Sequence, residues 1–574
     1  MTDLSCPLFY IQRNASISLS LFQQNLTFPS VIRIFDPINP KYDTMKRILS
    51  FLCVVLMAAF AWAEVTYDVL PLPRSIELNP KGGEYVLAEG AVVTYPAPNA
   101  KMASNAQLLA KYLKEDAGFG LKVQPDVKKG AAITLCLGLK NDCPDAYLLK
   151  VDKKGITIQG ATEEGVFRGL MTLRKAIGTE GGEKILLPFV TIQDEPRFAY
   201  RGVHFDTARH FFSVDFIKEF LDIMALHGCN QFHWHLTEDQ GWRFEVKSMP
   251  ELAQKGSVRK QTVIGRNAGI YDGQPYGGYY TQQECREIVA YAAKLFINVI
   301  PEIDLPGHML GALHVYPELG CTGGPYEVWP IWGVSEDVLC AGNPKTLEFL
   351  KQVYGELCDV FPSKLIHIGG DESPRVRWKN CPKCQAKMKE LGLTREAELQ
   401  TYINKEMDKF LTAKGRTIIG WDETLEGGLS ENGIVMSWRG MKGGIAAARQ
   451  HHRVIMTPTD YCYIDYYQLK DDWAQPHGIG GYLPVSKVYS MEPVPAELSE
   501  EESKFIMGAQ VNLWTEYVGY PDHAMYMLLP RLDAISEVQW MQPEQKDLEA
   551  FKVRLARMEK LYDKLNYKYC HKIE

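Results

Sequence analysis

The residues best suited to chemistry are two adjacent carboxylates, Asp371 and Glu372, at the end of LIHIGGDE (365–372). The apolar start of this segment is typical of a strand buried on both faces. Successive side chains on an extended backbone point to opposite sides, so the chain must bend before both carboxylates can serve one pocket. Gly369 and Gly370 make that bend possible. Because acidic pairs are also common in solvated loops, the pair indicates a site only together with the rest of the chain.

The same arrangement recurs along the chain after residue 197. Apolar segments of strand length lie at 200–206, 230–237, 297–304, 365–372, 417–423, 434–440, 453–465 and 507–516. Helical periodicity separates several of them, as at 214–228, 281–296 and 345–359, and it is weaker between the fifth and seventh. Eight strands with crossover helices predict an α/β fold, a (β/α)₈ TIM barrel.

Nearly every predicted strand ends in acidic, His, Trp or Arg residues. A barrel brings the carboxyl ends of its strands to one face, where active sites are built. Many carboxylates with indoles, phenols and an arginine describe a pocket for a polyol or a sugar, because acids and arginine grip hydroxyls while aromatic rings stack on the sugar face. We therefore expect a sugar-binding pocket at this face.

Other chemistries have less support in the sequence. His233 and His235 share one face of a strand and suit zinc, but no HExxH motif and no third ligand is evident, so we expect no metal and no cofactor. GxSxG, GxxxxGK[ST] and GxGxxG are absent. The net charge of −7 and the pI near 6.1 argue against nucleic acid as a partner.

The length of 574 residues predicts at least two domains, or a barrel with a smaller unit. Strands expected at 65–73, 90–96, 131–138, 147–160 and 186–196 alternate with helices at 102–118 and 163–178, which predicts a small α/β domain. The domain boundaries that we expect are a small α/β domain at 64–196, a catalytic barrel at 197–545 and a C-terminal helix within 546–574.

Residues 45–63 have every part of a secretory signal peptide. Two basic residues precede an apolar run, and Ala61–Trp62–Ala63 suits cleavage. We interpret Met45 as the true start and residues 1–44 as an upstream start artefact. The expected product is exported, to the periplasm or outside the cell, with no stable membrane span after cleavage. Its oligomeric state is left open.

Cysteine usage offers one further motif, Cys381-Pro-Lys-Cys384. Such a pair serves redox chemistry or half of a zinc site. Because no second CxxC or CxxH follows it, we favour a structural bridge or free thiols.

Eight motifs, in order, carry a resemblance to a known family: RGVHFDTARHFF, FHWHLTEDQGWR, PEIDLPGHM, HIGGDE, GWDE, SWRG, YCYIDYY and NLWTEYV. Over roughly 64–545 the chain resembles glycoside hydrolase family 20, the β-N-acetylhexosaminidases. The resemblance implies substrate-assisted retention, in which the 2-acetamido oxygen of the substrate attacks the anomeric carbon and forms an oxazolinium ion, an exception to the two-carboxylate scheme.

By this resemblance Glu372 is the general acid and base, and Asp371 orients the acetamido group. Like charge from Asp371 is expected to raise the pKa of Glu372. His308 matches a histidine that relays to the catalytic glutamate through an acid of the pair Glu238–Asp239. This pair is Asp-Asp more often in the family, so the sequence leaves open which of its members makes the contact.

Seven further residues match the family's substrate-binding positions. Arg209 matches an arginine that holds the 3- and 4-hydroxyls, and Tyr463 a tyrosine that hydrogen-bonds the acetamido carbonyl. Asp465 and Glu516 match acids that grip the 6- and 4-hydroxyls. The indoles that wall the pocket correspond to Trp421, Trp438 and Trp514.

The resemblance implies an exo-acting β-N-acetylhexosaminidase acting on glycans with terminal β-linked GlcNAc or GalNAc. A lacto-N-biosidase of the same family stays an alternative, because loops at 246–280 and 310–340 could widen the cleft for a disaccharide. A non-catalytic sugar-binding protein would be expected to lack Asp371 or Glu372, and both are present. An adhesive surface protein has no repeat or linker to support it.

Overall fold

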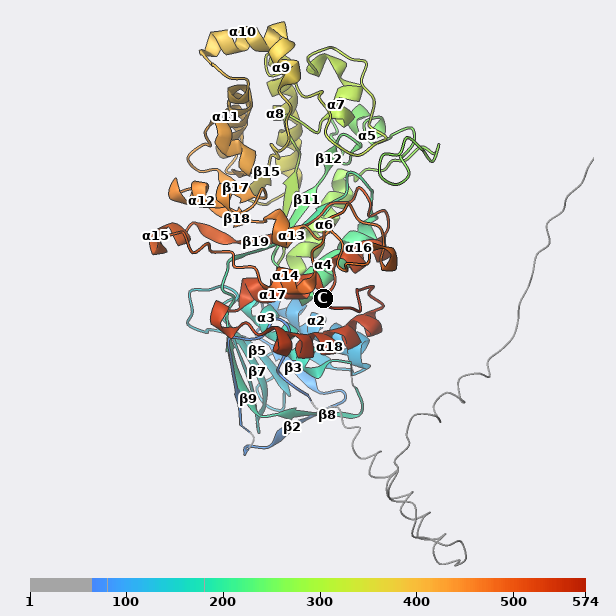
Figure 1. Ribbon diagram of the computed structural model, residues 1–574. Helices are drawn as coiled ribbons and strands as arrows, with labels where there is room; N and C mark the ends of the chain where they lie inside the picture. Colours follow the sequence, from blue (N-terminus) through green and yellow to red (C-terminus); the bar gives the residue numbers. More distant parts are fainter. Residues whose placement is uncertain (1–64, 80, 180) are drawn as a thin grey trace, which may run out of the picture. The chain divides into compact units, whose positions relative to one another are not determined.

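The computed structural model describes residues 65–79, 81–179 and 181–574, so the expectations for 1–44 and 45–63 fall outside the described residues. A closed barrel of eight parallel strands dominates it (Figure 1). In barrel order the strands are β10 (Tyr200–Asp206), β11 (Gln231–His235), β14 (Asn298–Glu302), β15 (Leu365–His367), β16 (Thr417–Trp421), β17 (Ile434–Ser437), β18 (Val454–Met456) and β19 (Ile506–Leu513). The predicted (β/α)₈ fold is confirmed.

Helices follow most of the barrel strands. They include α4 (Val214–Leu226), α6 (Gln282–Lys294), α8 (Pro344–Val360), α11 (Ala397–Ala413), α12 (Lys442–Arg449), α16 (Pro521–Leu528) and α17 (Arg531–Trp540). Local sequence fixes the start of α6, since the hydroxyl of Thr281 and the carboxylate of Glu284 form a reciprocal capping box there. Between β16 and β17 there is only the short 3₁₀ helix η2 (Asp422–Gly427), where the helical pattern was weak. Among the described helices, none has the length and apolarity of a membrane span.

The seventh strand is shorter than the sequence predicted. The segment 453–465 was expected to be extended throughout, but β18 ends at Met456 and Pro458 caps the helical turn α13 (Thr459–Cys462). Proline has no amide to continue a strand ladder and suits a helix start. The chain then returns to the barrel, where Ile464 donates its amide to the carbonyl of Asn512 in β19 at 2.9 Å.

A second sheet precedes the barrel. It has seven strands, and in spatial order they are β1 (Ser75–Leu78), β9 (Val190–Asp194), β6 (Tyr147–Asp152), β7 (Gly155–Gly160), β5 (Ile133–Leu137), β3 (Val92–Tyr95) and β4 (Lys122–Pro125). Two helices, α2 (Ala100–Ala117) and α3 (Glu163–Ile177), pack on this sheet and on each other. The predicted small α/β layer is therefore present.

The first expected strand of this layer was wrong. Residues 65–73 have no strand geometry, because Pro71 and Pro73 cannot donate amides to a ladder, and β1 begins only at Ser75. Short β2 (Glu84–Ala88), which pairs with β8 (Lys184–Pro188), and β4 were not expected, since each has mostly exposed side chains and no clear apolar alternation.

Buried polar contacts join the small sheet to the barrel. Arg201 on β10 places Nη2 2.9 Å from Oδ1 of Asp145, and Arg168 on α3 places Nε 2.8 Å from the same oxygen. Trp540 at the end of α17 donates its indole N–H to Asp194 on β9 at 3.0 Å. The last helix, α18 (Leu548–Leu565), contacts α2 and holds Arg554 against Glu537 of α17 at 3.0 Å.

Candidate active site

A sharp bend after β15 carries the acidic pair to the barrel rim. Gly369 and Gly370 have φ of +63° and +102°, and Glu372 itself has φ of +45°. The amide of Gly370 donates to Oδ1 of Asp304 at 2.9 Å, which fixes the bend against the end of β14. A Cβ on Gly369 would lie 1.8 Å from that same oxygen, so only glycine fits. The expected bend is thus present, and Asp371 and Glu372 leave the strand together.

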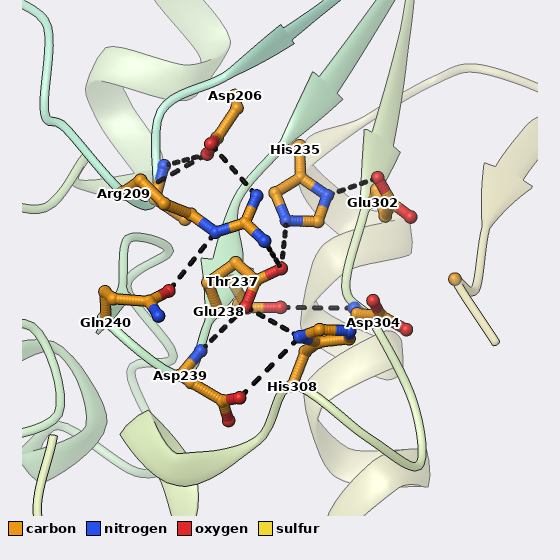
Figure 2. Close-up of polar contacts among 12 residues, drawn as sticks. Asp206, Arg209, His235, Thr237, Glu238, Asp239, Gln240, Glu302, Asp304 and His308 are labelled. Carbon is orange, nitrogen blue, oxygen red and sulfur yellow. Dashed lines mark hydrogen bonds and ion pairs between the residues drawn. The ribbon is translucent and has the colours of Figure 1, made fainter. Parts of the chain in front are cut away.

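His308 joins the acidic pair to a second pair of acids. Its Nε2 lies 3.7 Å from Oδ2 of Asp371 and 3.9 Å from Oε2 of Glu372. Its Nδ1 lies 2.9 Å from Oε2 of Glu238, against 3.7 Å from Oδ2 of Asp239 (Figure 2). The geometry therefore answers the question that the sequence left open, because Glu238 is the closer partner.

Asp239 accepts backbone amides from the surrounding loops. Its carboxylate accepts the backbone amides of Leu310 at 3.1 Å and Ser335 at 3.3 Å, and its carbonyl accepts the amide of Trp329 at 2.8 Å. These contacts tie the loop that carries His308 to the loop that precedes α8. Asp239 thus organises the surroundings of His308.

Positive and negative side chains alternate from Arg209 through Glu238 and His308 to the acidic pair. Burial alone would raise the pKa of Glu238, but Arg209 and His308 outweigh it and hold that pKa well below the usual value. Burial likewise opposes the charge of His308, yet Glu238 and Asp239 raise its pKa well above normal. The pKa of Glu372 is raised by burial and then by the negative charge of Asp371. The protonated form of Glu372 is therefore favoured more than in an ordinary glutamate, as a group that must carry a proton requires.

Arg209 is held by three carboxylates. Its Nη1 lies 3.1 Å from Asp206, while Nη2 lies 2.7 Å from Glu238 and 3.8 Å from Glu516. Figure 2 shows the guanidinium between Asp206 and Glu238. It also lies over the indole of Trp514, 5.0 Å from the ring centroid. A buried arginine held in this way is a rigid donor for hydroxyl groups.

The three expected indoles lie near one another, with the tyrosine among them. Trp421 and Trp514 have ring centroids 6.0 Å apart, and Tyr463 lies 6.1 Å from Trp438 and 6.5 Å from Trp514. Trp438 donates its indole N–H to Glu423 at 2.9 Å. These rings, from the ends of β16, β17 and β19 and from the turn after α13, form one aromatic wall.

Beneath this wall lies a buried hub that the sequence did not identify. The carboxylate of Glu302 on β14 contacts His235 at 2.5 Å, His367 at 2.8 Å and His233 at 2.9 Å, and it accepts the indole N–H of Trp421 at 3.0 Å. The sequence indicated that His233 and His235 share one face of a strand. It did not identify Glu302, which contacts both of them from the neighbouring strand β14. The hub fixes the plane of Trp421.

Several acceptors in the pocket have no partner among the described residues. They are Oδ1 of Asp371 and both carboxylate oxygens of Asp465. Burial, with the charge of Glu516, raises the pKa of Asp465 well above its ordinary value. A buried carboxylate without donors costs free energy, so these oxygens are suited to accept N–H and O–H groups from a ligand.

One residue near the acidic pair was given no role from sequence. Glu423 follows Asp422 after β16, and burial followed by the charge of Asp371 raises its pKa to about 8. Its position in GWDE at a strand end was the only signal. Its hydrogen bond with Trp438 makes it a support for the aromatic wall.

Comparison with known proteins agrees with this geometry. The model of the catalytic domain of glycosyl hydrolase family 20 matches residues 198–543, and that of domain 2 of the same family matches 66–195. The chain belongs to glycosyl hydrolase family 20. All twelve site residues expected from the sequence lie on the family 20 catalytic domain, at the ends of its barrel strands or in the loops that follow them.

Named relatives and solved structures of family 20 cover most of this chain. A β-hexosaminidase of Porphyromonas gingivalis is 41% identical over 85% of the chain, and one of Vibrio furnissii is 36% identical over 82%. The chain spans 62% of the length of the first and 76% of the second. The structure of the β-N-acetylhexosaminidase from Streptomyces coelicolor has a TM-score of 0.77 at 31% identity and covers 89% of this chain and 99% of its own.

A separate hollow lies beside the family 20 site. A cleft of about 550 Å³ is lined by residues from 260–271 and 325–337, together with Leu310 and Arg377. Leu310 and Ser335, which donate amides to Asp239, form part of its wall. None of the twelve expected site residues lines this cleft. The two loops singled out from the sequence thus shape a space next to the site.

Proposed function

We propose that the chain is an exo-acting, retaining β-N-acetylhexosaminidase that removes terminal non-reducing β-linked GlcNAc or GalNAc from glycans. The observation that carries this proposal is Oδ1 of Asp371, a buried acceptor without a partner among the described residues, next to Glu372, whose pKa is raised. A solved relative from Vibrio harveyi is an exo β-N-acetylglucosaminidase in complex with N-acetylglucosamine, at 31% identity and a TM-score of 0.77.

Each step of the reaction has a group on this chain. Glu372 protonates the leaving oxygen, and Asp371 accepts the acetamido N–H so that the acetamido oxygen attacks the anomeric carbon. The resulting oxazolinium cation lies against the negative charge of Asp371. Glu372 then takes a proton from water, which attacks the same carbon and restores the β configuration. His308, charged by its contact with Glu238, stabilises the anionic form of Glu372 that exists between the two steps.

The polar side chains that would bind the hydroxyls of the terminal sugar at the non-reducing end of a glycan support an exo mode of cleavage. Arg209 and Glu516 approach each other at 3.8 Å, and Asp465 and Glu516 interact through their charges. Hydroxyls at positions 3, 4 and 6 of one sugar would satisfy these groups. The aromatic wall of Trp421, Trp438 and Trp514 would surround the acetamido group and the apolar sugar face.

Export belongs to the same proposal. The pattern at 45–63 supports a cleaved signal peptide and a periplasmic or extracellular enzyme. A glycan with terminal N-acetylhexosamine is the expected partner. Deleting residues 1–44 is expected to leave export intact, as measured by cell fractionation.

The decisive experiment uses a 4-nitrophenyl β-N-acetylglucosaminide, with the β-glucoside as control and an oxazoline-mimicking thiazoline as inhibitor. Turnover of the acetamido substrate alone, blocked by the thiazoline, supports both the activity and the substrate-assisted route. Equal turnover of the plain glucoside would overturn the route, since that substrate has no acetamido oxygen. Inactivity on both would overturn the proposal for single sugars.

The cleft formed by 260–271 and 325–337 favours one alternative, an enzyme that releases a disaccharide such as lacto-N-biose. Its more exposed aromatic residues, Tyr271 and Trp329, are suited to stacking on a second sugar. Release of the disaccharide from a lacto-N-bioside, without release of single sugars, would establish this alternative.

A further inference from the structure

Four cysteines from separate parts of the chain meet in one place. They are Cys321, Cys340, Cys381 and Cys384, whose sulfur atoms all lie within 4.8 Å of one another. All eleven cysteines in the described ranges are free, and these four are the only ones gathered in a group of this kind there. The other clusters with metal-ligand residues contain Glu302, Glu238 or Glu372 and belong to the site described above.

The sulfur spacings fit one particular occupant. Cys340 lies 3.6 Å from Cys384 and 3.7 Å from Cys381, and Cys321 lies 3.8 Å from Cys384. A tetrahedral zinc ion with Zn–S bonds of about 2.3 Å separates its sulfurs by about 3.8 Å. The sulfurs of a disulfide lie about 2.05 Å apart. The spacings therefore match the edges of a Cys₄ zinc tetrahedron and not a pair of disulfides.

The backbone brings the segment with Cys340 close to the turn that carries Cys381 and Cys384. Cys381 precedes α10 (Pro382–Leu391), so Cys384 lies in the first turn of that helix. Gly342 packs so closely on this turn that a Cβ there would lie 2.1 Å from the carbonyl oxygen of Lys383. Cys340, Cys381 and Cys384 are buried, with exposures of 0%, 4% and 0%. Buried thiolates need a cation, and a zinc ion supplies its charge at the centre of the group.

The cluster also lies next to the loops that hold the catalytic groups. Leu339, adjacent to Cys340, donates its amide to the carbonyl of Pro306 at 2.9 Å, two residues before His308. The carbonyl of Leu339 accepts the indole N–H of Trp378 at 2.9 Å, in the segment that leads from Glu372 to Cys381. An ion at the cluster would therefore hold the segments around Pro306, Leu339 and Trp378 together at one side of the site.

From this geometry we propose that Cys321, Cys340, Cys381 and Cys384 bind one structural zinc ion that ties the loop before α8 to the segment after the catalytic pair. The thiols lose their protons as the metal binds, and no electron transfer is involved. All four positions of the metal are filled by sulfur, so it is a closed site without a place for substrate. The upstream cysteines precede the CxxC motif by about forty to sixty residues, which is why a search for a following partner did not reveal them.

The test is metal analysis of the purified full chain together with Cys384→Ser. We expect one zinc per wild-type chain by mass spectrometry of the metal, and its near-complete loss in Cys384→Ser. The matched control is Cys136→Ser, a partly exposed cysteine on β5 outside the cluster, which should keep the zinc. Zinc that persists in Cys384→Ser, or iron in its place, would overturn the proposal.

A second measurement holds even where Cys384→Ser fails to fold. Titration of the wild-type protein with an organomercurial should release the zinc in step with four thiols, read by a metallochromic dye. Cobalt(II) substitution should give the visible bands of tetrahedral thiolate coordination. An intact mass showing two disulfides, with no zinc, would contradict the site. None of these readouts depends on hydrolase activity.

Discussion

The raised pKa of Glu372 depends on its neighbour as well as on burial. Asp371→Asn removes the like charge, so the pKa of Glu372 should fall and its protonated form should be lost at lower pH. We expect the basic limb of kcat/KM against pH to move to lower pH, and kcat to fall about 10²- to 10³-fold because the oxazolinium loses its counter-charge. The measurement is a pH–rate profile with the aryl acetamido substrate.

Glu372→Gln provides the comparison for that profile. It should lose hydrolysis about 10²- to 10⁴-fold, and the basic limb should disappear because the titrating acid is gone. Sugar affinity should persist in binding measurements, since the amide keeps the shape of the side chain. A profile of Asp371→Asn that coincides with wild type would exclude the coupling between the two carboxylates.

Glu238 and Asp239 should differ sharply although they are adjacent. Glu238→Gln leaves Arg209 and His308 without their closest carboxylate, so the pKa of His308 should drop and kcat should fall. Asp239→Asn keeps an acceptor for only one of the amides of Leu310 and Ser335, but it leaves the carboxylate of Glu238 on Arg209 and His308, so its loss of kcat should be smaller. Histidine titration by NMR and steady-state kinetics of both variants test this. A larger loss of kcat in Asp239→Asn than in Glu238→Gln would mean that Asp239, not Glu238, is the acid that acts on His308.

At the scale of elements, the bend after β15 should be intolerant of any side chain. In Gly369→Ala the Cβ meets Asp304, which is itself held by the amide of Gly370. Gly415→Ala is the matched control, because its φ of +71° is similar but nothing lies within 4 Å of a Cβ there. We expect the control to lose about 1–2 kcal/mol of unfolding free energy from backbone strain alone. Gly369→Ala should lose more, with loss of activity; equal melting temperatures would contradict the crowding.

Elements were largely predictable because strand hydrophobicity and strand-end polarity are local signals. All eight barrel strands begin near the expected residues, and two end well before the expected residue. The fourth ends at His367, before the glycine bend, and the seventh ends at Met456, before the helical turn that follows Pro458. Edge strands β2 and β4 were missed since their exposed side chains carry no alternation. The hub at Glu302 and the four-cysteine cluster were also missed, because contacts between segments far apart in sequence follow from barrel closure rather than from spacing.

At the scale of the whole described unit, the buried contact between the small sheet and the barrel depends on Asp145. Burial would raise its pKa, but Arg201 and Arg168 outweigh this and hold the pKa below the usual value. Asp145→Asn removes the charge that both guanidinium groups share, leaving Arg201 without an anionic partner in a buried place. Breaking such a contact costs about 3–5 kcal/mol, and urea unfolding at neutral pH measures it.

The stability that Asp145 contributes should depend on pH. A carboxyl group with a depressed native pKa stabilises the fold above its unfolded pKa of about 3.9, and that stability is lost as pH falls toward the native value. The difference between wild type and Asp145→Asn should therefore be greatest near neutral pH and should shrink in acid. Asp215→Asn, at a side chain that is 97% exposed, should match wild type throughout. A difference that persists unchanged in acid would mean that shape rather than charge joins the small sheet to the barrel.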